Sequence, residues 1–210
     1  MFKRSVVINA KRIKPIKLDY PTVILFSVLI CGIIIGVSIS KKIIYSQNDF
    51  LTVLINNYIS MIKDCTFFEC FVSIFLVIFS VAFIVFLIGF CAVGTPLAWL
   101  IPALYGCFCS SVITCLLIKY GIQGIGYCLL INIPCYAITA ATIIKCCCES
   151  SRLSIELLSV LTGAASREKG KYKLLQEYII NYMILCIPLI CAALLKTVSF
   201  KLFSGFFSFI

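Results

Sequence analysis

The 210-residue chain is too apolar to be an ordinary water-soluble domain. Hydrophobic residues make up 62% of it and charged residues 12%, whereas about 25% of a typical soluble domain is charged. A net charge of +10 would suggest nucleic acid if the basic residues lay on a folded soluble face. They lie instead between apolar runs and at the N-terminus. We therefore expect an all-α, polytopic transmembrane bundle of about five spans in contact with the bilayer, not with nucleic acid.

Residues 1–21 form the first predicted unit, a basic cytoplasmic arm that contains six Lys and Arg residues. Residues 22–210 are expected to form a single integral membrane domain. Its first span, about 22–40, contains Gly32 and Gly36 in a GxxxG spacing, which lets a neighbouring helix approach closely. The same spacing leaves a homo-oligomer open as an alternative.

A polar segment, Lys41 to Glu69, is expected to leave the bilayer after this span. Its apolar residues recur with the period of an amphipathic helix: Leu51, Leu54, Ile55, Tyr58, Ile59 and Ile62. We expect an interfacial helix here, and this segment is the expected place for a protein partner to bind.

The run from Cys70 to Ile118 contains 49 residues without a charged side chain. As one helix it would be about 73 Å long, more than twice the hydrocarbon thickness, so it must hold two spans, about 71–90 and 96–118. Gly94 is predicted to end the first helix and Pro96 to lie in the first turn of the next. Within the second span, Pro102 is expected to kink the helix and Gly106 to allow close packing.

Two further spans are expected, at about 127–144 and 178–195. The sequence YGIQGIG before the first of them predicts a short hairpin. Between the spans lies a second polar block, Ser150 to Tyr178. Leu153, Leu157, Val160 and Leu161 share one helical face there, which predicts a second interfacial helix followed by a basic loop.

The distribution of basic residues predicts the orientation. With the N-terminus inside, cytoplasmic segments carry twelve Lys and Arg residues and outer segments carry six. Positive residues are enriched in cytoplasmic loops. We therefore expect a cell-membrane protein with its N-terminus inside and its C-terminus outside.

Chemistry-bearing residues are scarce. The chain has no histidine and eight acidic residues, none of them deep within a predicted span, so we expect no catalytic site, metal, cofactor or intrinsic enzymatic activity. Most of the fourteen cysteines lie in apolar runs and are expected to pack as small hydrophobic residues. The Cys146–Cys148 cluster is expected to pack in the same way, with reversible acylation or a reactive thiol as alternatives.

The order of spans and a few Gly and Pro positions resemble the stage II sporulation protein M family of endospore-forming bacteria. The family's G-x-P turn, followed by a further glycine, matches Gly94, Pro96 and Gly106. Its glycine-containing hairpin, followed by a span with an early proline, is similar to GIQGIGYCLLINIP with Pro134. The resemblance covers most of Ser27 to Phe203.

The resemblance implies a non-enzymatic membrane scaffold for forespore engulfment, which joins two peptidoglycan-degrading, cell-wall-remodelling proteins at the septal membrane. One departure lies after the last span. There the family tends to have an acidic residue that could pair with a partner, and this chain has Lys196 and Lys201.

Transport is the alternative function. The chain would then be a permease subunit or a substrate-binding component that is energised by a separate ATPase. The irregular Gly and Pro backbone of the third and fourth spans would line a cavity. The candidate ligand contacts are Trp99, Tyr105, Asn132 and Tyr136. Two of them also have structural interpretations: Trp99 suits an interfacial belt, and Asn132 can bond a neighbouring helix.

Overall fold

The computed structural model describes residues 20–45, 53, 65–162, 171–203 and 206. The N-terminal arm up to residue 19, and all but Val53 of the expected amphipathic helix around residues 51–62, lie outside the described residues. The described elements, in chain order, are α1 (Tyr20–Tyr45), α3 (Phe67–Gly89), α4 (Gly94–Tyr127), the π-helical turn η1 (Cys128–Asn132), α5 (Ile133–Leu161) and α6 (Lys171–Phe203).

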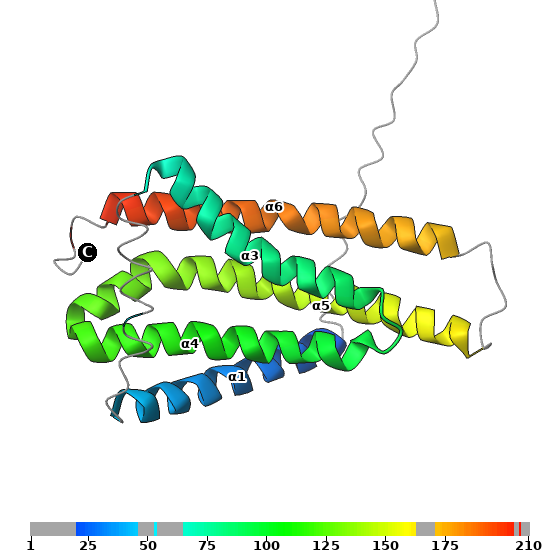
Figure 1. Ribbon diagram of the computed structural model, residues 1–210, viewed down its shortest axis with the longest axis horizontal. Helices are drawn as coiled ribbons and strands as arrows, with labels where there is room; N and C mark the ends of the chain where they lie inside the picture. Colours follow the sequence, from blue (N-terminus) through cyan, green and yellow to red (C-terminus); the bar gives the residue numbers. More distant parts are fainter. Residues whose placement is uncertain (1–19, 46–52, 54–64, 163–170, 204–205, 207–210) are drawn as a thin grey trace, which may run out of the picture.

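These helices lie side by side in a bundle (Figure 1). Helix α4 packs between α1 and α5, α6 lies against α5, and α3 crosses both α5 and α6. The start of α1, the α3–α4 turn and the end of α5 lie at one end of the bundle, which we call the turn end. The chain reverses between α4 and α5 at the opposite end, which we call the hairpin end.

Four of the described helical segments are long and apolar enough to cross a membrane: 20–42, 67–89, 94–161 and 175–203. The predicted fold class, a helical membrane bundle, is therefore confirmed, although the continuous apolar segments number four among the described residues and not about five. The difference has a simple cause. The predicted spans 96–118 and 127–144 both lie in the third segment, which is 68 residues long and folds back on itself (Figure 1).

Gly121 makes this reversal. Its φ of 53° and ψ of −126° interrupt an otherwise helical backbone. Residues other than glycine rarely adopt this backbone conformation. The predicted hairpin in YGIQGIG is therefore present, but it is built from helix with a single non-helical residue.

Pro134 explains the π-helical turn that precedes it in the chain. Pro134 has no N–H group and its ring would clash with the carbonyl of residue 130 in a regular helix. The backbone widens over Cys128–Asn132, and the N–H of Ile133 donates to the carbonyl oxygen of Cys128. This turn leaves Asn132 directly before α5.

Glycines bring α1 and α4 into direct backbone contact. A Cβ atom at Gly32 would overlap the backbone of Ala103, and one at Gly36 would overlap that of Cys107. From the other side, a Cβ at Gly106 would lie 2.6 Å from the carbonyl oxygen of Leu29. The predicted close approach at both sites is confirmed, and the GxxxG face of α1 packs against α4 of the same chain.

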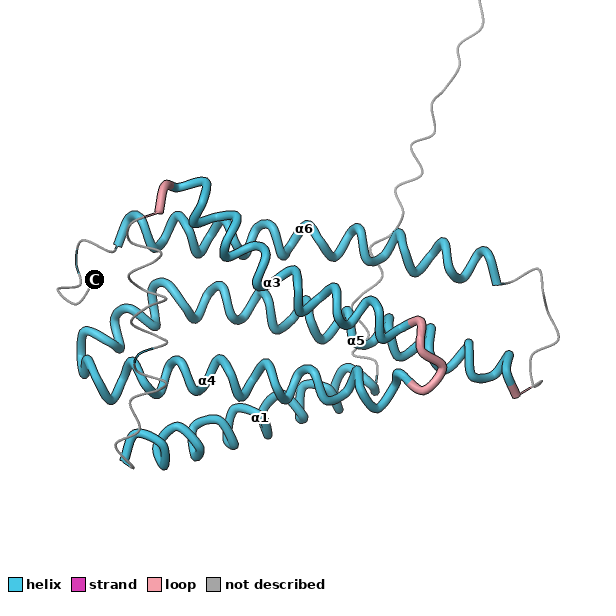
Figure 2. Tube along the Cα trace, viewed as in Figure 1, coloured by secondary structure: helices cyan, strands magenta, loops and turns pink. Residues whose placement is uncertain are grey.

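The turn between α3 and α4 departs from its prediction in one detail. Helix α3 ends at Gly89, four residues form the turn, and Gly94 begins α4 where it was expected to end the preceding helix. Gly94 is needed because a Cβ there would overlap the carbonyl oxygen of Ile88. Pro96 lies in the first turn of α4, as predicted. Figure 2 shows this turn as a loop between two helices.

Two serines of α5 hold this turn against the bundle. Ser150 Oγ donates to the carbonyl oxygen of Val85 at 3.0 Å, and Ser154 Oγ donates to that of Cys91 at 2.8 Å. Thr95 Oγ1 donates to Ser154 Oγ at 3.3 Å. These bonds link α5 to the last turns of α3 and to the α3–α4 turn.

Two tyrosines of α6 complete the same junction. The Tyr178 hydroxyl donates to the carbonyl oxygen of Phe86 at 3.0 Å, and the Tyr182 hydroxyl donates to that of Cys146 at 3.4 Å. The Tyr178 ring also stacks on Phe86, with centroids 5.3 Å apart. We call these tyrosines, with Thr95, Ser150 and Ser154, the turn-end network. It fixes α3, α4, α5 and α6 relative to one another.

The prediction of a second, separate interfacial helix after Ser150 is wrong. Its sequence continues α5 without a break to Leu161. Leu153 is buried in the core and Leu157 packs against that core, whereas Leu161 is exposed. The apolar face was therefore identified correctly in its first half, but it packs on the bundle. The basic loop was predicted at residues 167–173; its first four residues lie outside the described residues, and its last three begin α6.

Candidate functional site

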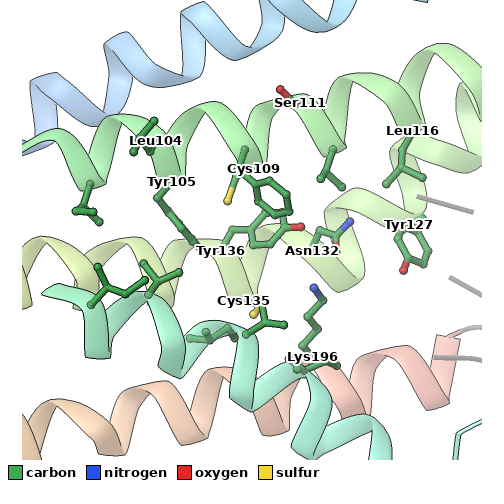
Figure 3. A pocket seen from close by; sticks show the side chains of 18 residues that line it. Leu104, Tyr105, Cys109, Ser111, Leu116, Tyr127, Asn132, Cys135, Tyr136 and Lys196 are labelled. Carbon is green, nitrogen blue, oxygen red and sulfur yellow. The ribbon is translucent and has the colours of Figure 1, made fainter. Parts of the chain in front are cut away.

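A cavity of about 540 Å³ lies among α3, α4, α5 and α6. Its volume is within the range of about 300–1,000 Å³ that is typical of ligand sites. Most of the lining is aliphatic or aromatic, and the polar groups are few (Figure 3). The polar or polarisable side chains that line it are Tyr105, Cys109, Ser111, Tyr127, Asn132, Cys135, Tyr136 and Lys196.

Lys196 is the unusual residue of this site. It belongs to α6, seven positions before the helix ends at Phe203, which corresponds to a depth of about 10 Å below that helix end. The residue is only 8% exposed to solvent. A charged side chain inside a membrane is costly and usually marks a functional site. Among the described residues that line the cavity, none is acidic.

The Tyr136 ring stabilises this ammonium group. Lys196 Nζ lies 5.2 Å from the ring centroid of Tyr136, within the distance at which an aromatic face attracts a cation. Figure 3 shows the Lys196 side chain extending from α6 toward Tyr136 and Asn132, which come from α5 and η1.

Asn132 adds a neutral polar group beside this cation. It is 3% exposed and ends the π-helical turn, an irregularity that is frequent at functional sites. Figure 3 shows the Asn132 side chain and the Tyr136 hydroxyl on the side of the cavity toward which Lys196 extends. The three side chains together form a small polar corner in an apolar cavity.

A second cavity, of about 490 Å³, lies among α1, α4 and α5. Tyr105, Cys109 and Tyr136 line both cavities. Residues from α4 and α5 thus separate the two spaces at the centre of the bundle.

The candidate contacts separate into two groups. Tyr105, Asn132, Tyr136 and Lys196 line the same cavity. Trp99 does not line it; its ring packs against the core near the turn end, where its Nε1 is buried and makes no hydrogen bond.

The predicted motif residues do not line the cavity that contains Lys196, although Gly106 lines the second cavity. Pro102 is buried within α4 and Gly106 packs against α1. Pro134 follows directly after η1 and Asn132, so its effect on the backbone helps to position the polar corner.

Several lining residues were not singled out in the sequence. Cys109, Cys135, Ser111 and Tyr127 were part of ordinary apolar spans. Lys196 was singled out as a candidate contact or partner position because of the change of charge at the end of a span, and not as a residue that lines a cavity. The available signal was that a lysine occurs among apolar residues one turn or more before the end of a helix.

The cysteine cluster takes no part in this cavity. Cys146 and Cys147 are fully buried in the core, and Cys148 is partly buried. No group of metal-binding side chains occurs among the described residues.

Comparisons with protein families, with characterised proteins and with solved structures find no match to this chain.

Proposed function

We propose that this multi-pass membrane protein is a non-enzymatic scaffold that positions partner proteins at the membrane. The observation that carries the proposal is the way α5 and α6 continue past the α3–α4 turn (Figure 1). With 29 and 33 residues, they are about 44 and 50 Å long. The hydrocarbon core is only about 30 Å thick.

This extension is a rigid surface on which a partner can dock. The turn-end network holds α5 and α6 against the rest of the bundle, and Asn181 Nδ2 donates to Glu149 Oε2 at 3.2 Å between the two helices. Arg152 and Glu156 form an exposed ion pair, with Nε and Oε1 3.6 Å apart. A rigid pair of helices with polar side chains suits the positioning of a complex better than catalysis.

The resemblance to the stage II sporulation protein M family supplies the proposed biological setting. In that setting the chain joins cell-wall hydrolases at the septal membrane during forespore engulfment. The hydrolase-recruiting segment is Lys41 to Glu69 together with the periphery of the bundle, and most of that segment lies outside the described residues.

Two measurements in the sporulating host test this function. We expect affinity-tagged protein, purified from membranes of sporulating cells, to bring cell-wall hydrolases with it, and we expect a deletion strain to stall in engulfment. Complementation with Arg152→Glu alone should impair engulfment, because it breaks the ion pair with Glu156 on the docking surface. The double variant Arg152→Glu/Glu156→Arg restores a pair of opposite charges and should preserve engulfment. Lys119→Glu is the matched control, because it reverses an exposed charge on α4 beside the Gly121 reversal, outside both Lys41 to Glu69 and the α5–α6 extension. A deletion strain that engulfs normally would exclude the scaffold role.

The cavity favours a second candidate, a transporter subunit. Asn132, Tyr136 and Lys196 give it the polar contacts that a ligand site requires. This alternative predicts that the tagged protein is purified with a membrane-associated ATPase and without cell-wall hydrolases.

The proposed orientation places the turn end in the cytoplasm and the hairpin end outside. We expect a reporter that functions only in the cytosol to be active when fused at Met1 and inactive when fused at Ile210. The physical reason is the excess of basic residues in the segments assigned to the inside. The opposite activity pattern would reverse the topology and would contradict the recruitment of cell-wall hydrolases by Lys41 to Glu69.

A further inference from the structure

We infer that the cavity among α3, α4, α5 and α6 is a binding site for a fatty acid. The carboxylate would pair with Lys196, and the acyl chain would lie along the apolar walls that α3 and α4 provide. This site does not depend on the scaffold role, and the fatty acid supplies the ligand class that the transporter alternative leaves open for the same cavity.

The cavity opens sideways toward lipid. Val77 and Ile84 of α3 and Leu104 and Phe108 of α4 line the cavity, and all four are exposed on the surface of the membrane-spanning helices. At the hairpin end the space is closed by packed side chains, among them Leu116 and Tyr127. A ligand that enters between α3 and α4 therefore comes from the bilayer.

The lining fits an amphiphile and not a water-soluble molecule. The wall made by α3 and α4 is aliphatic or aromatic over most of its area, for example at Val81 and Ile101. The polar groups gather at Lys196, Asn132 and Tyr136 (Figure 3), so the ligand should have one polar end and one apolar body.

The charge at the polar corner selects the headgroup. Lys196 is the single basic residue among the described residues that line the cavity, so it balances one negative charge. A carboxylate carries one charge, whereas phosphate groups are commonly bound by several basic residues or by the fork of an arginine. The Asn132 amide and the Tyr136 hydroxyl can donate hydrogen bonds to the same carboxylate.

Binding to the purified full-length protein in detergent tests the site. We expect saturable binding of radiolabelled palmitate and at least tenfold weaker binding of the matching alcohol, hexadecanol, which lacks the charge. Lys196→Met removes the charge and keeps a long apolar side chain, so it should weaken palmitate binding at least tenfold and leave hexadecanol unchanged. Lys196→Arg should restore most of the palmitate affinity.

Two other variants separate the site from general effects on the protein. Lys201→Met removes an exposed lysine of the same helix and should bind palmitate like the wild type. Val112→Trp fills the cavity and should weaken palmitate and hexadecanol alike. Each variant must show the elution profile of a folded protein.

Three outcomes would overturn the inference. They are equal binding of palmitate and hexadecanol, palmitate binding that Lys196→Met leaves unchanged, and stronger competition by a lysophospholipid than by palmitate. None of these outcomes bears on whether cell-wall hydrolases are purified with the chain, so the site and the scaffold role can fail separately.

Discussion

Gly36→Leu is expected to separate α1 from α4 and to destabilise the protein by about 3 kcal/mol, the upper end of the range for overpacked cores. The added side chain would overlap the Cys107 backbone and the Ser110 side chain. Backbone atoms cannot move aside as a flexible side chain can, so the whole helix has to shift. Thermal unfolding of the purified protein in detergent, followed by loss of the monodisperse elution peak, would measure the effect.

Ser38→Leu is the matched control for this substitution. It adds a leucine two residues further along α1, at an exposed position where the serine hydroxyl bonds only to the carbonyl oxygen of Ile34 in its own helix. We expect a melting temperature close to that of the wild type. If both variants have the melting temperature of the wild type, the α1–α4 packing described above is wrong.

Gly121→Ala is expected to lower stability by about 1–3 kcal/mol. Nothing lies within 4 Å of a Cβ atom built at this glycine, so the penalty does not come from a clash with a neighbour. It comes from the backbone, whose positive φ is strained for alanine. The same unfolding measurement would detect it.

Ile122→Ala provides the control at the adjacent position. Ile122 is 88% exposed and lies in the same helical segment, so its truncation should leave the melting temperature nearly unchanged. Equal stability of Gly121→Ala and the wild type would show that the reversal between α4 and α5 does not require this backbone conformation.

The positions of the membrane spans could be predicted because bilayer thickness limits the length of each apolar segment. The uncharged run from Cys70 to Ile118 is too long for one crossing, and the chain does turn at residues 90–93. The reversal near Gly121 could also be predicted from glycine spacing. The helix ends were predicted less accurately. The polar residues from Ser150 onward suggested that the chain leaves the bilayer there, but α5 continues through Ser150 and Ser154.

The cavity could not be predicted because it depends on how each helix is rotated about its axis. In a membrane, lipid-facing and buried positions are both apolar, so hydropathy does not distinguish Phe108, which faces outward, from Cys109, which is buried. Tyr105, Asn132 and Tyr136, which were grouped as possible contacts, line the same cavity. Trp99 was grouped with them because it lies in the third predicted span, but its position near the turn end places it outside the cavity lining.

An apolar cavity changes the balance between the possible ligands of a transporter. A water-soluble substrate would need more hydrogen-bonding groups than Lys196, Asn132 and Tyr136 supply around a space of about 540 Å³. A scaffold that holds a fatty acid would have its helix packing tuned by the surrounding lipid. Palmitate binding is therefore compatible with a scaffold. If the chain is a transporter subunit, the same result would indicate an apolar substrate.

The contact between Gly36 and α4 affects how the protein must be made. The backbone that Gly36 touches, at Cys107, is 71 residues further along the chain, which takes roughly 4 to 14 s to synthesise at 5–20 residues per second. During that interval α1 is already in the membrane with its glycine face against lipid or against an insertion chaperone. Correct assembly therefore requires that α1 waits beside the insertion site until α4 emerges, and a nascent chain stalled before α4 would be an early target for membrane proteases.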